Sequence, residues 1–290
     1  MQTPTWHEQA VVFDCEGCRL IGIVTQPETQ SEHGVVIVVG GPQYRAGSHR
    51  QFTLLARQLA AQGIASIRFD YRGMGDSEGD MRNFENLDAD IRAAIDALLA
   101  QVPGLRQLTL WGLCDAASAA LYYAHTDARV HKLVLLNPWV HSPAGAARAR
   151  LKYYYLSRLM QRSFWSKLFS GKLKLGESAR DLASAAQSTH ADNSAPADPR
   201  HGSAGYISRM LEGLKRFNGD TLFILSGNDL TAQEFIALTA RDAAWKKSCA
   251  APSVRQVIVQ GANHTFSTQF WRTAVETHTV QWIHSSGVKS

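Results

Sequence analysis

One cysteine lies where a strand-like run meets a helix-like run, a placement typical of a catalytic nucleophile. The run LTLWG (residues 108–112) leads into the turn GLCDA (residues 112–116), and an alanine-rich helical stretch follows. This layout matches the nucleophile elbow G-x-S-x-G, with Cys114 in place of serine and Ala116 in place of the second glycine. The N-terminus of the following helix favours a thiolate. The alternative is a buried structural cysteine at a strand–helix junction.

Two other residues have the chemistry and the position to complete a catalytic triad. Asp229 lies just past the apolar run 221–227, and His264 lies just past the run 254–261. Like Cys114, they come after the carboxyl ends of predicted strands, where open α/β sheets place their sites. We therefore expect Cys114 to attack a carbonyl carbon, His264 to take and return the proton, and Asp229 to orient His264.

The rest of the chain alternates between strand-like and helix-like segments. Residues 10–26 alternate in polarity around a turn and predict a β-hairpin. Later apolar runs are separated by helical patterns; they cover residues 35–39, 64–69, 108–112, 133–137, 221–227 and 254–261. Strands alternating with helices predict a mostly parallel sheet with helices on both faces. A chain of 290 residues that is 45% hydrophobic can form this as a single domain, residues 1–290.

The region between residues 138 and 220 interrupts this alternation. It has no strand-like run, and helical stretches flank the small, polar segment 184–205. We predict a helical cap insertion over residues 141–218, within the domain and above the active-site edge of the sheet. The net charge of +5 is concentrated here, because residues 141–176 hold eight Lys and Arg and no Asp or Glu. A basic, aromatic cap fits peripheral membrane contact, and a solvated face is the alternative. No nucleic-acid motif accompanies it.

Several motifs together resemble the α/β-hydrolase superfamily over nearly the whole chain. Residues 69–79, FDYRGMGDSEG, are similar to that superfamily's D-x-R-G-x-G-x-S-x-G loop. The order nucleophile, acid, histidine is also that of the α/β-hydrolase fold. More narrowly, three segments resemble the type 1 hydrolase associated with the exosortase A system; they are residues 40–52, 112–120 and 226–235. The resemblance implies the α/β-hydrolase fold and a hydrolase activity linked to exopolysaccharide-producing bacteria, without a settled substrate.

The sequence departs from the usual superfamily pattern in two places. Cysteine replaces serine at position 114, as in the dienelactone hydrolases of the superfamily, and a thiolate–imidazolium pair with His264 is expected. In the loop that supplies an oxyanion-hole N–H group, Gly40-Gly41 is followed by Pro42, which has no N–H. The expected donors are therefore the N–H groups of Gln43 and Asp115.

These features predict an acyl ester or thioester hydrolase, or an acyltransferase, acting on a small molecule without metal or organic cofactor. The rival is a non-catalytic binding or scaffold member of an exopolysaccharide assembly system. The first residues lack the basic start and apolar stretch of a signal peptide, and no 18-residue apolar run follows, so a cytoplasmic location is expected. The sequence leaves the oligomeric state open.

Other tempting residues have plainer interpretations. Cys15 and Cys18 form a C-x-x-C without a second ligand pair, which favours a hairpin turn over a metal or redox site. Arg45 and His49 follow the glycine-rich loop and could bind an anionic or sugar group, but a structural role is favoured. Asp70 and Arg72 are expected to hold their turn through charged hydrogen bonds, outside the triad.

Overall fold

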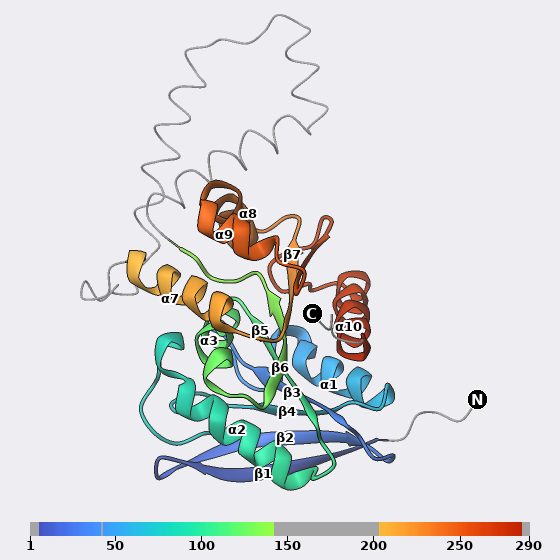
Figure 1. The fold of residues 1–290 in the computed structure, drawn as a ribbon. Coiled ribbons are helices and arrows are strands. Elements are labelled where there is room, and N and C mark those ends of the chain that lie inside the picture. Colours follow the sequence, from blue (N-terminus) through green and yellow to red (C-terminus); the bar gives the residue numbers. More distant parts are fainter. Residues whose placement is uncertain (1–5, 42, 142–202, 286–290) are drawn as a thin grey trace, which may run out of the picture.

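The computed structural model describes residues 6–41, 43–141 and 203–285, and within them eight strands form one sheet (Figure 1). The strand order is β1-β2-β4-β3-β5-β6-β7-β8. The first two strands are antiparallel, and β3 to β8 all run parallel. The strand bounds are β1 Trp6–Cys15, β2 Cys18–Pro27, β3 His33–Val38, β4 Ala65–Phe69, β5 Gln107–Leu113, β6 Val130–Leu136, β7 Asp220–Ser226 and β8 Val254–Val259. The predicted hairpin and mostly parallel sheet are confirmed.

Helices cover both faces of the sheet, as Figure 1 shows. On one face lie α1 (Gln51–Ala61) and α10 (Gln269–His284), which share a buried apolar cluster with the sheet. The other face is covered by α2 (Asp88–Gln101), α3 (Asp115–Tyr123) and α7 (Ser203–Arg216), together with α8 (Leu230–Arg241) and α9 (Ala243–Cys249). Short 3₁₀ turns lie at Ser48–Arg50, Phe84–Asn86 and Ala124–Thr126. Both layers are therefore anchored on strands that are buried on both sides.

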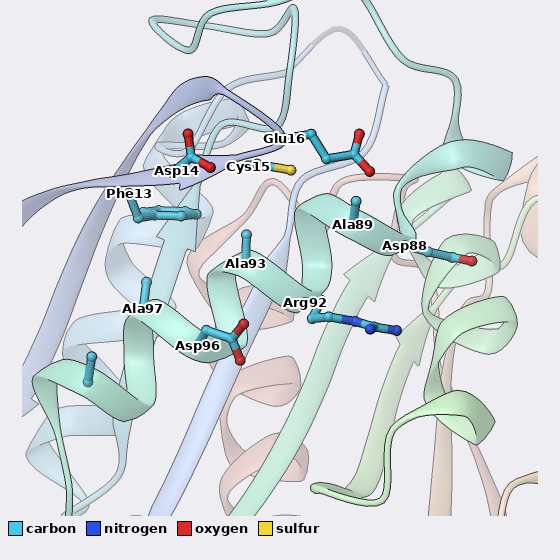
Figure 2. Close-up of a pocket in the computed structure, with 11 residues that line it drawn as sticks. Phe13, Asp14, Cys15, Glu16, Asp88, Ala89, Arg92, Ala93, Asp96 and Ala97 are labelled. Atoms are coloured by element: carbon cyan, nitrogen blue, oxygen red, sulfur yellow. The ribbon is translucent and has the colours of Figure 1, made fainter.

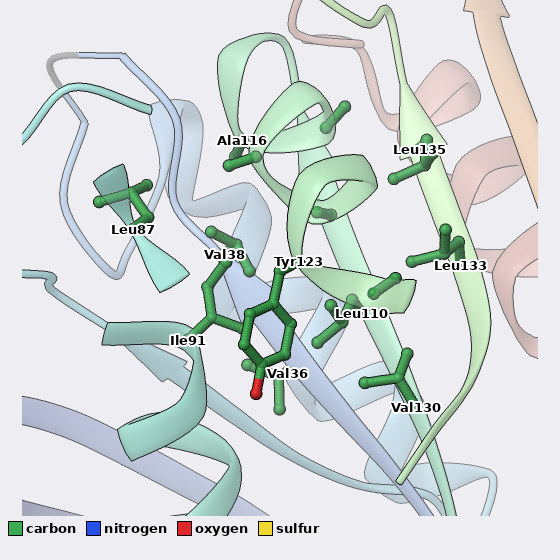
Figure 3. Packing of buried hydrophobic residues seen from close by; sticks show 14 of the residues in the cluster. Val36, Val38, Leu87, Ile91, Leu110, Ala116, Tyr123, Val130, Leu133 and Leu135 are labelled. Atoms are coloured by element: carbon green, nitrogen blue, oxygen red, sulfur yellow. The ribbon is translucent and has the colours of Figure 1, made fainter. Parts of the chain in front are cut away.

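The larger core cluster fixes the helix that follows Cys114. Figure 3 shows Tyr123 of α3 reaching between Ile91 of α2 and Val36 of β3. All three side chains are fully buried. The Tyr123 hydroxyl donates a hydrogen bond to Asp127 Oδ2 at 2.5 Å, so its polar atom is satisfied. This packing holds α3 against the sheet and thereby fixes its first residues beside β5.

The predicted cap lies only partly within the described residues. Residues 142–202, which include the eight Lys and Arg counted in residues 141–176 and the predicted membrane contact, lie outside them. The end of the cap forms α7, which crosses α3 closely: a Cβ on Gly213 would come 2.0 Å from the Leu121 backbone oxygen. Among the described residues, no helix is long and apolar enough to span a membrane.

Candidate active site

Cys114 lies in a strained turn between β5 and α3. Its backbone has φ 63° and ψ −123°, a left-handed conformation that costs a non-glycine residue on the order of 1–3 kcal/mol. Hydrogen bonds hold the turn: the Cys114 N–H donates to the Leu136 oxygen at 2.9 Å, and the Cys114 oxygen accepts from the Trp139 N–H at 3.2 Å. The geometry is that of a nucleophile elbow, with a partly exposed side chain at the carboxyl end of β5.

Two glycines allow the elbow to form. A Cβ on Gly112 would come 2.7 Å from the Ala116 carbonyl, so only glycine lets α3 turn back over the end of β5. A Cβ on Gly40 would come 2.4 Å from both the Leu113 oxygen and Asp115 Oδ1. Ala116 is fully buried and takes the place of the second motif glycine without needing a positive φ. The loop after β3 and the elbow are therefore in close backbone contact.

The structure brings Asp229 and His264 together. His264 Nδ1 lies 3.0 Å from Asp229 Oδ2, although the two residues follow different strands, β7 and β8. Asp229 is also the N-cap of α8, where Oδ2 accepts a hydrogen bond from the Ala232 N–H at 3.0 Å. The hydrogen bond from the Ala232 N–H fixes the orientation of the Asp229 carboxylate. The carboxylate in turn holds the Nδ1 edge of the imidazole toward Asp229. The other ring nitrogen, Nε2, is left for proton transfer.

A residue that the sequence did not single out supports the histidine loop. Asn137, fully buried just after β6, donates from Nδ2 to the His264 backbone oxygen at 3.0 Å and to Ser226 Oγ at 2.8 Å. Its Oδ1 accepts from the Ser226 N–H at 2.8 Å, and Ser226 Oγ donates to the Asn263 oxygen at 2.9 Å. The only signal in the sequence was a polar residue closing the apolar run 133–137. Asn137 thus ties the ends of β6 and β7 to the loop that carries His264.

The loop after β3 meets the elbow through the side chain of Asp115. The Gly41 N–H donates to Asp115 Oδ1 at 2.8 Å, and the Ala116 N–H donates to the same oxygen at 2.9 Å. The side chain of Gln43 lies elsewhere, with Oε1 accepting from the Ser48 N–H at 3.2 Å. Gln43 also lines a hollow of 380 Å³ with Tyr44 and Met74. The Gln43 N–H remains a predicted oxyanion donor, and the Asp115 carboxyl was not anticipated.

The expected thiolate at Cys114 is wrong for this structure. Burial raises the pKa of the thiol to about 12, and the negative charges of Asp115 and Asp229 also raise it. The hydrogen bond from the Asp115 backbone N–H acts in the opposite direction and is outweighed. Cys114 does precede a helix N-terminus, which lowers the pKa of a thiol. Burial and the two acidic neighbours raise this pKa by more, and the fold rather than the local sequence places them there. Cys114 is therefore a neutral thiol that needs a base.

The loop residues kept out of the triad hold the structure together. Arg45 pairs with the fully buried Asp70, and also with Asp76 at 2.7 Å. Arg72 forms a buried ion pair with Asp90 at 2.8 Å and also contacts Glu16. His49 lies in the 3₁₀ turn that leads into α1. The structural interpretation of Arg45, Asp70 and Arg72 is confirmed by these contacts.

The C-x-x-C pair belongs to the first hairpin. Cys15 and Cys18 face each other across its turn, and both are free thiols. Figure 2 shows Cys15 between Asp14 and Glu16 on the hairpin, with Arg92 on α2. These residues line an open hollow between the hairpin and α2, with a volume of 660 Å³. None of the three triad candidates lines it. Within the described ranges, no group of three or more His, Cys, Asp or Glu is placed to hold a metal ion.

Known proteins share this fold. An esterase of Pyrococcus furiosus, Pf2001, superposes with a TM-score of 0.64 at 14% identity, covering 96% of this chain and 92% of the esterase. A dienelactone hydrolase of Anabaena variabilis superposes with a TM-score of 0.60 at 17% identity, covering 97% of both chains. These likenesses establish the fold.

Sequence comparison gives the family. The polyketide transferase grgF of a Penicillium species is 29% identical over 102 residues, 32% of this chain; the chain spans only 33% of that relative's length. Residues 30–264 match the family described as serine aminopeptidase, S33. Since this match covers most of the sequence, the chain belongs to that family and has its α/β-hydrolase fold.

Proposed function

We propose that the protein cleaves a small acyl ester or thioester, or transfers its acyl group, with Cys114 as the nucleophile. One observation carries the proposal: Cys114 is held at φ 63° above the end of β5, on the sheet edge where His264 and Asp229 meet at 3.0 Å. The family is named for serine enzymes, so the cysteine is this chain's own departure. Cysteine performs the same acyl chemistry when a histidine is available.

The neutral thiol sets the order of events. Sγ attacks the carbonyl carbon while its proton moves to Nε2 of His264, and Asp229 stabilises the imidazolium that forms. The imidazolium then gives the proton to the leaving oxygen or sulfur, which leaves an acyl group on Sγ. Water or an alcohol or thiol acceptor attacks this thioester and gives its proton to the same nitrogen. The bond between the acyl carbon and Sγ then breaks, the acid or the new ester or thioester leaves, and the imidazolium returns the proton to Sγ. The proposed oxyanion donors are the N–H groups of Gln43 and Asp115.

Transfer is to be tested alongside hydrolysis. The relative from Penicillium is named a polyketide transferase, which supports including acyl acceptors other than water. The three motifs that resemble the exosortase A-associated hydrolase support a role beside exopolysaccharide production, and the hydroxyl groups of sugars are the acceptors we would try first. The 380 Å³ hollow beside Gln43 and the exposed Tyr44 offer room for such a group.

The experiment is a screen of p-nitrophenyl esters and acyl thioesters of increasing chain length. Wild type is compared with Cys114→Ala and with Cys114→Ser, which restores the residue of the family's elbow motif. We expect no turnover above background for Cys114→Ala and measurable ester cleavage for Cys114→Ser. Wild-type rates in Cys114→Ala would contradict the proposal. A wild-type protein that cleaves nothing on the panel would favour the scaffold alternative.

A further inference from the structure

The carboxyl group of Asp115 occupies the place where backbone N–H groups converge beside Cys114. Its Oδ1 accepts from the Gly41 N–H at 2.8 Å and from the Ala116 N–H at 2.9 Å. The fit is tight, because a Cβ on Gly40 would lie 2.4 Å from that oxygen. The side chain therefore fills the gap between the loop after β3 and the first turn of α3.

This gap has the properties of an oxyanion site. A helix N-terminus presents N–H groups and a partial positive charge, and a loop N–H from another strand end approaches it, which together stabilise a negative oxygen. The tetrahedral intermediate of acyl transfer needs donors of this kind. A carboxylate oxygen offers them a similar partner in advance. The resting enzyme thus carries its own anion next to the proposed nucleophile.

The charge of Asp115 acts on two titratable groups near it. It raises the pKa of Cys114 on its own turn and that of Tyr71, which follows β4. His264, which follows β8, acts in return to lower the pKa of Asp115, while burial is the larger effect and raises it. Asp229, after β7, adds its charge at Cys114. A second negative charge developing on the substrate oxygen would be repelled by the Asp115 carboxylate at this point.

We propose that Asp115 is a gating residue. At rest its carboxylate occupies the N–H groups of Gly41 and Ala116, which would otherwise add to the proposed donors of Gln43 and Asp115 at the oxyanion, and it must release Gly41 or become neutral before acyl transfer. The inference rests on the proposed function, because it takes Cys114 as the nucleophile. Asp115 acts through the N–H groups of Gly41 and Ala116 and through the thiol of Cys114. It does not itself touch the substrate, so it is a positioning residue. Turnover is then limited by the carboxylate, and neutralising the side chain relieves that limit.

Two variants separate the charge from the contact. Asp115→Asn keeps an oxygen that can accept from Gly41 and Ala116 but carries no charge, and Asp115→Ala removes the side chain. We measure two quantities for each against wild type: the pH profile of Cys114 alkylation by iodoacetamide, and kcat and KM for a small p-nitrophenyl ester. Thermal unfolding of each variant reports its folding, and Asp115→Asn still tests the charge where Asp115→Ala does not fold.

The expected result has two parts. Alkylation at pH 8 becomes severalfold faster in Asp115→Asn, because removing the charge lowers the pKa of the thiol, and its profile moves to lower pH. In Asp115→Ala kcat rises at least about threefold with little change in KM, since the Gly41 and Ala116 N–H groups are then free to support the oxyanion beside those of Gln43 and Asp115. Unchanged alkylation profiles, or a lower kcat in folded Asp115→Ala, would overturn the gate. Turnover that survives in Cys114→Ala would instead overturn the proposed function, while the alkylation profile still reports on Asp115.

Discussion

The side chain of Asn137 donates a hydrogen bond to the backbone oxygen of His264 at 3.0 Å. The bond joins the end of β6 to the loop after β8, two strands away in the sheet. Asn137 itself adopts φ 44°, a left-handed conformation that Asn tolerates better than most residues. Because its Nδ2 and Oδ1 atoms both bond to Ser226 as well, one buried amide sets the relative positions of three strand ends.

Replacing Asn137 should reduce both stability and turnover. Asn137→Asp removes the donor to His264 while keeping size and backbone preference, so the His264 oxygen and the Ser226 hydroxyl each lose a hydrogen bond. We expect the free energy of unfolding to fall by about 1–3 kcal/mol in urea titrations. We also expect kcat to fall with little change in KM, since His264 is displaced. Ser226→Ala, which leaves the Asn137–His264 bond, is the control. Wild-type kcat in Asn137→Asp would show that the bond does not position His264.

Asp229 has two roles that substitution can separate. Asp229→Asn keeps an oxygen for the Ala232 N–H and so preserves the α8 cap, but it removes the charge that stabilises imidazolium. We expect kcat to fall about 10²-fold or more with nearly unchanged stability. Asp229→Ala should show the same loss of kcat and, in addition, a drop of about 0.5–2 kcal/mol in the free energy of unfolding from the lost cap. Equal kcat in wild type and Asp229→Asn would remove Asp229 from the triad.

The reactivity of Cys114 should follow its raised pKa. Only the thiolate reacts with iodoacetamide, and below the pKa its fraction grows tenfold for each pH unit. With a pKa of about 12, the alkylation rate should keep rising between pH 7 and 9 without a plateau. The measurement is loss of free Cys114 by mass spectrometry of the peptide that contains it, with Cys114→Ala as the background. A plateau below pH 8 would mean that a thiolate–imidazolium pair forms after all.

The sequence sufficed for features that depend on local pattern and chain order. Apolar runs after turns located β3 to β8, and the residues after three of these runs turned out to share one sheet edge. The sequence could not show that the Asp115 carboxylate turns toward the Gly41 and Ala116 N–H groups beside Cys114, because a linear motif does not indicate the direction of a side chain. For the same reason the thiolate prediction failed. The electrostatic field at the N-terminus of α3 can be predicted from the local sequence. The burial of Cys114 and the approach of Asp229 arise only from tertiary packing.

The hydrogen-bond partners of Asn137 could not be predicted from the sequence either. A single polar residue after an apolar run is ordinary in sequence, and its partners Ser226 and His264 lie 89 and 127 residues further along the chain. Buried amides bond to whatever the fold brings near, so their partners follow from topology and register. The register that pairs Leu136 with Ile224 places Asn137 beside Ser226, which is information that one strand alone does not contain.

The crossing of α7 and α3 provides a matched test on one helix. A Cβ on Gly213 would lie 2.0 Å from the Leu121 backbone oxygen, so Gly213→Ala must push the two helices apart; a cost of about 1–3 kcal/mol is expected for such overpacking. Gly205 lies on the same helix, and a Cβ there would have no atom within 4 Å, so Gly205→Ala should be neutral or stabilise the helix by up to about 1 kcal/mol. Urea unfolding of both variants measures the difference. Since α3 begins at the elbow, Gly213→Ala should also slow ester turnover, whereas Gly205→Ala should not. Equal stability of the two variants would mean that α7 does not hold α3 in this position.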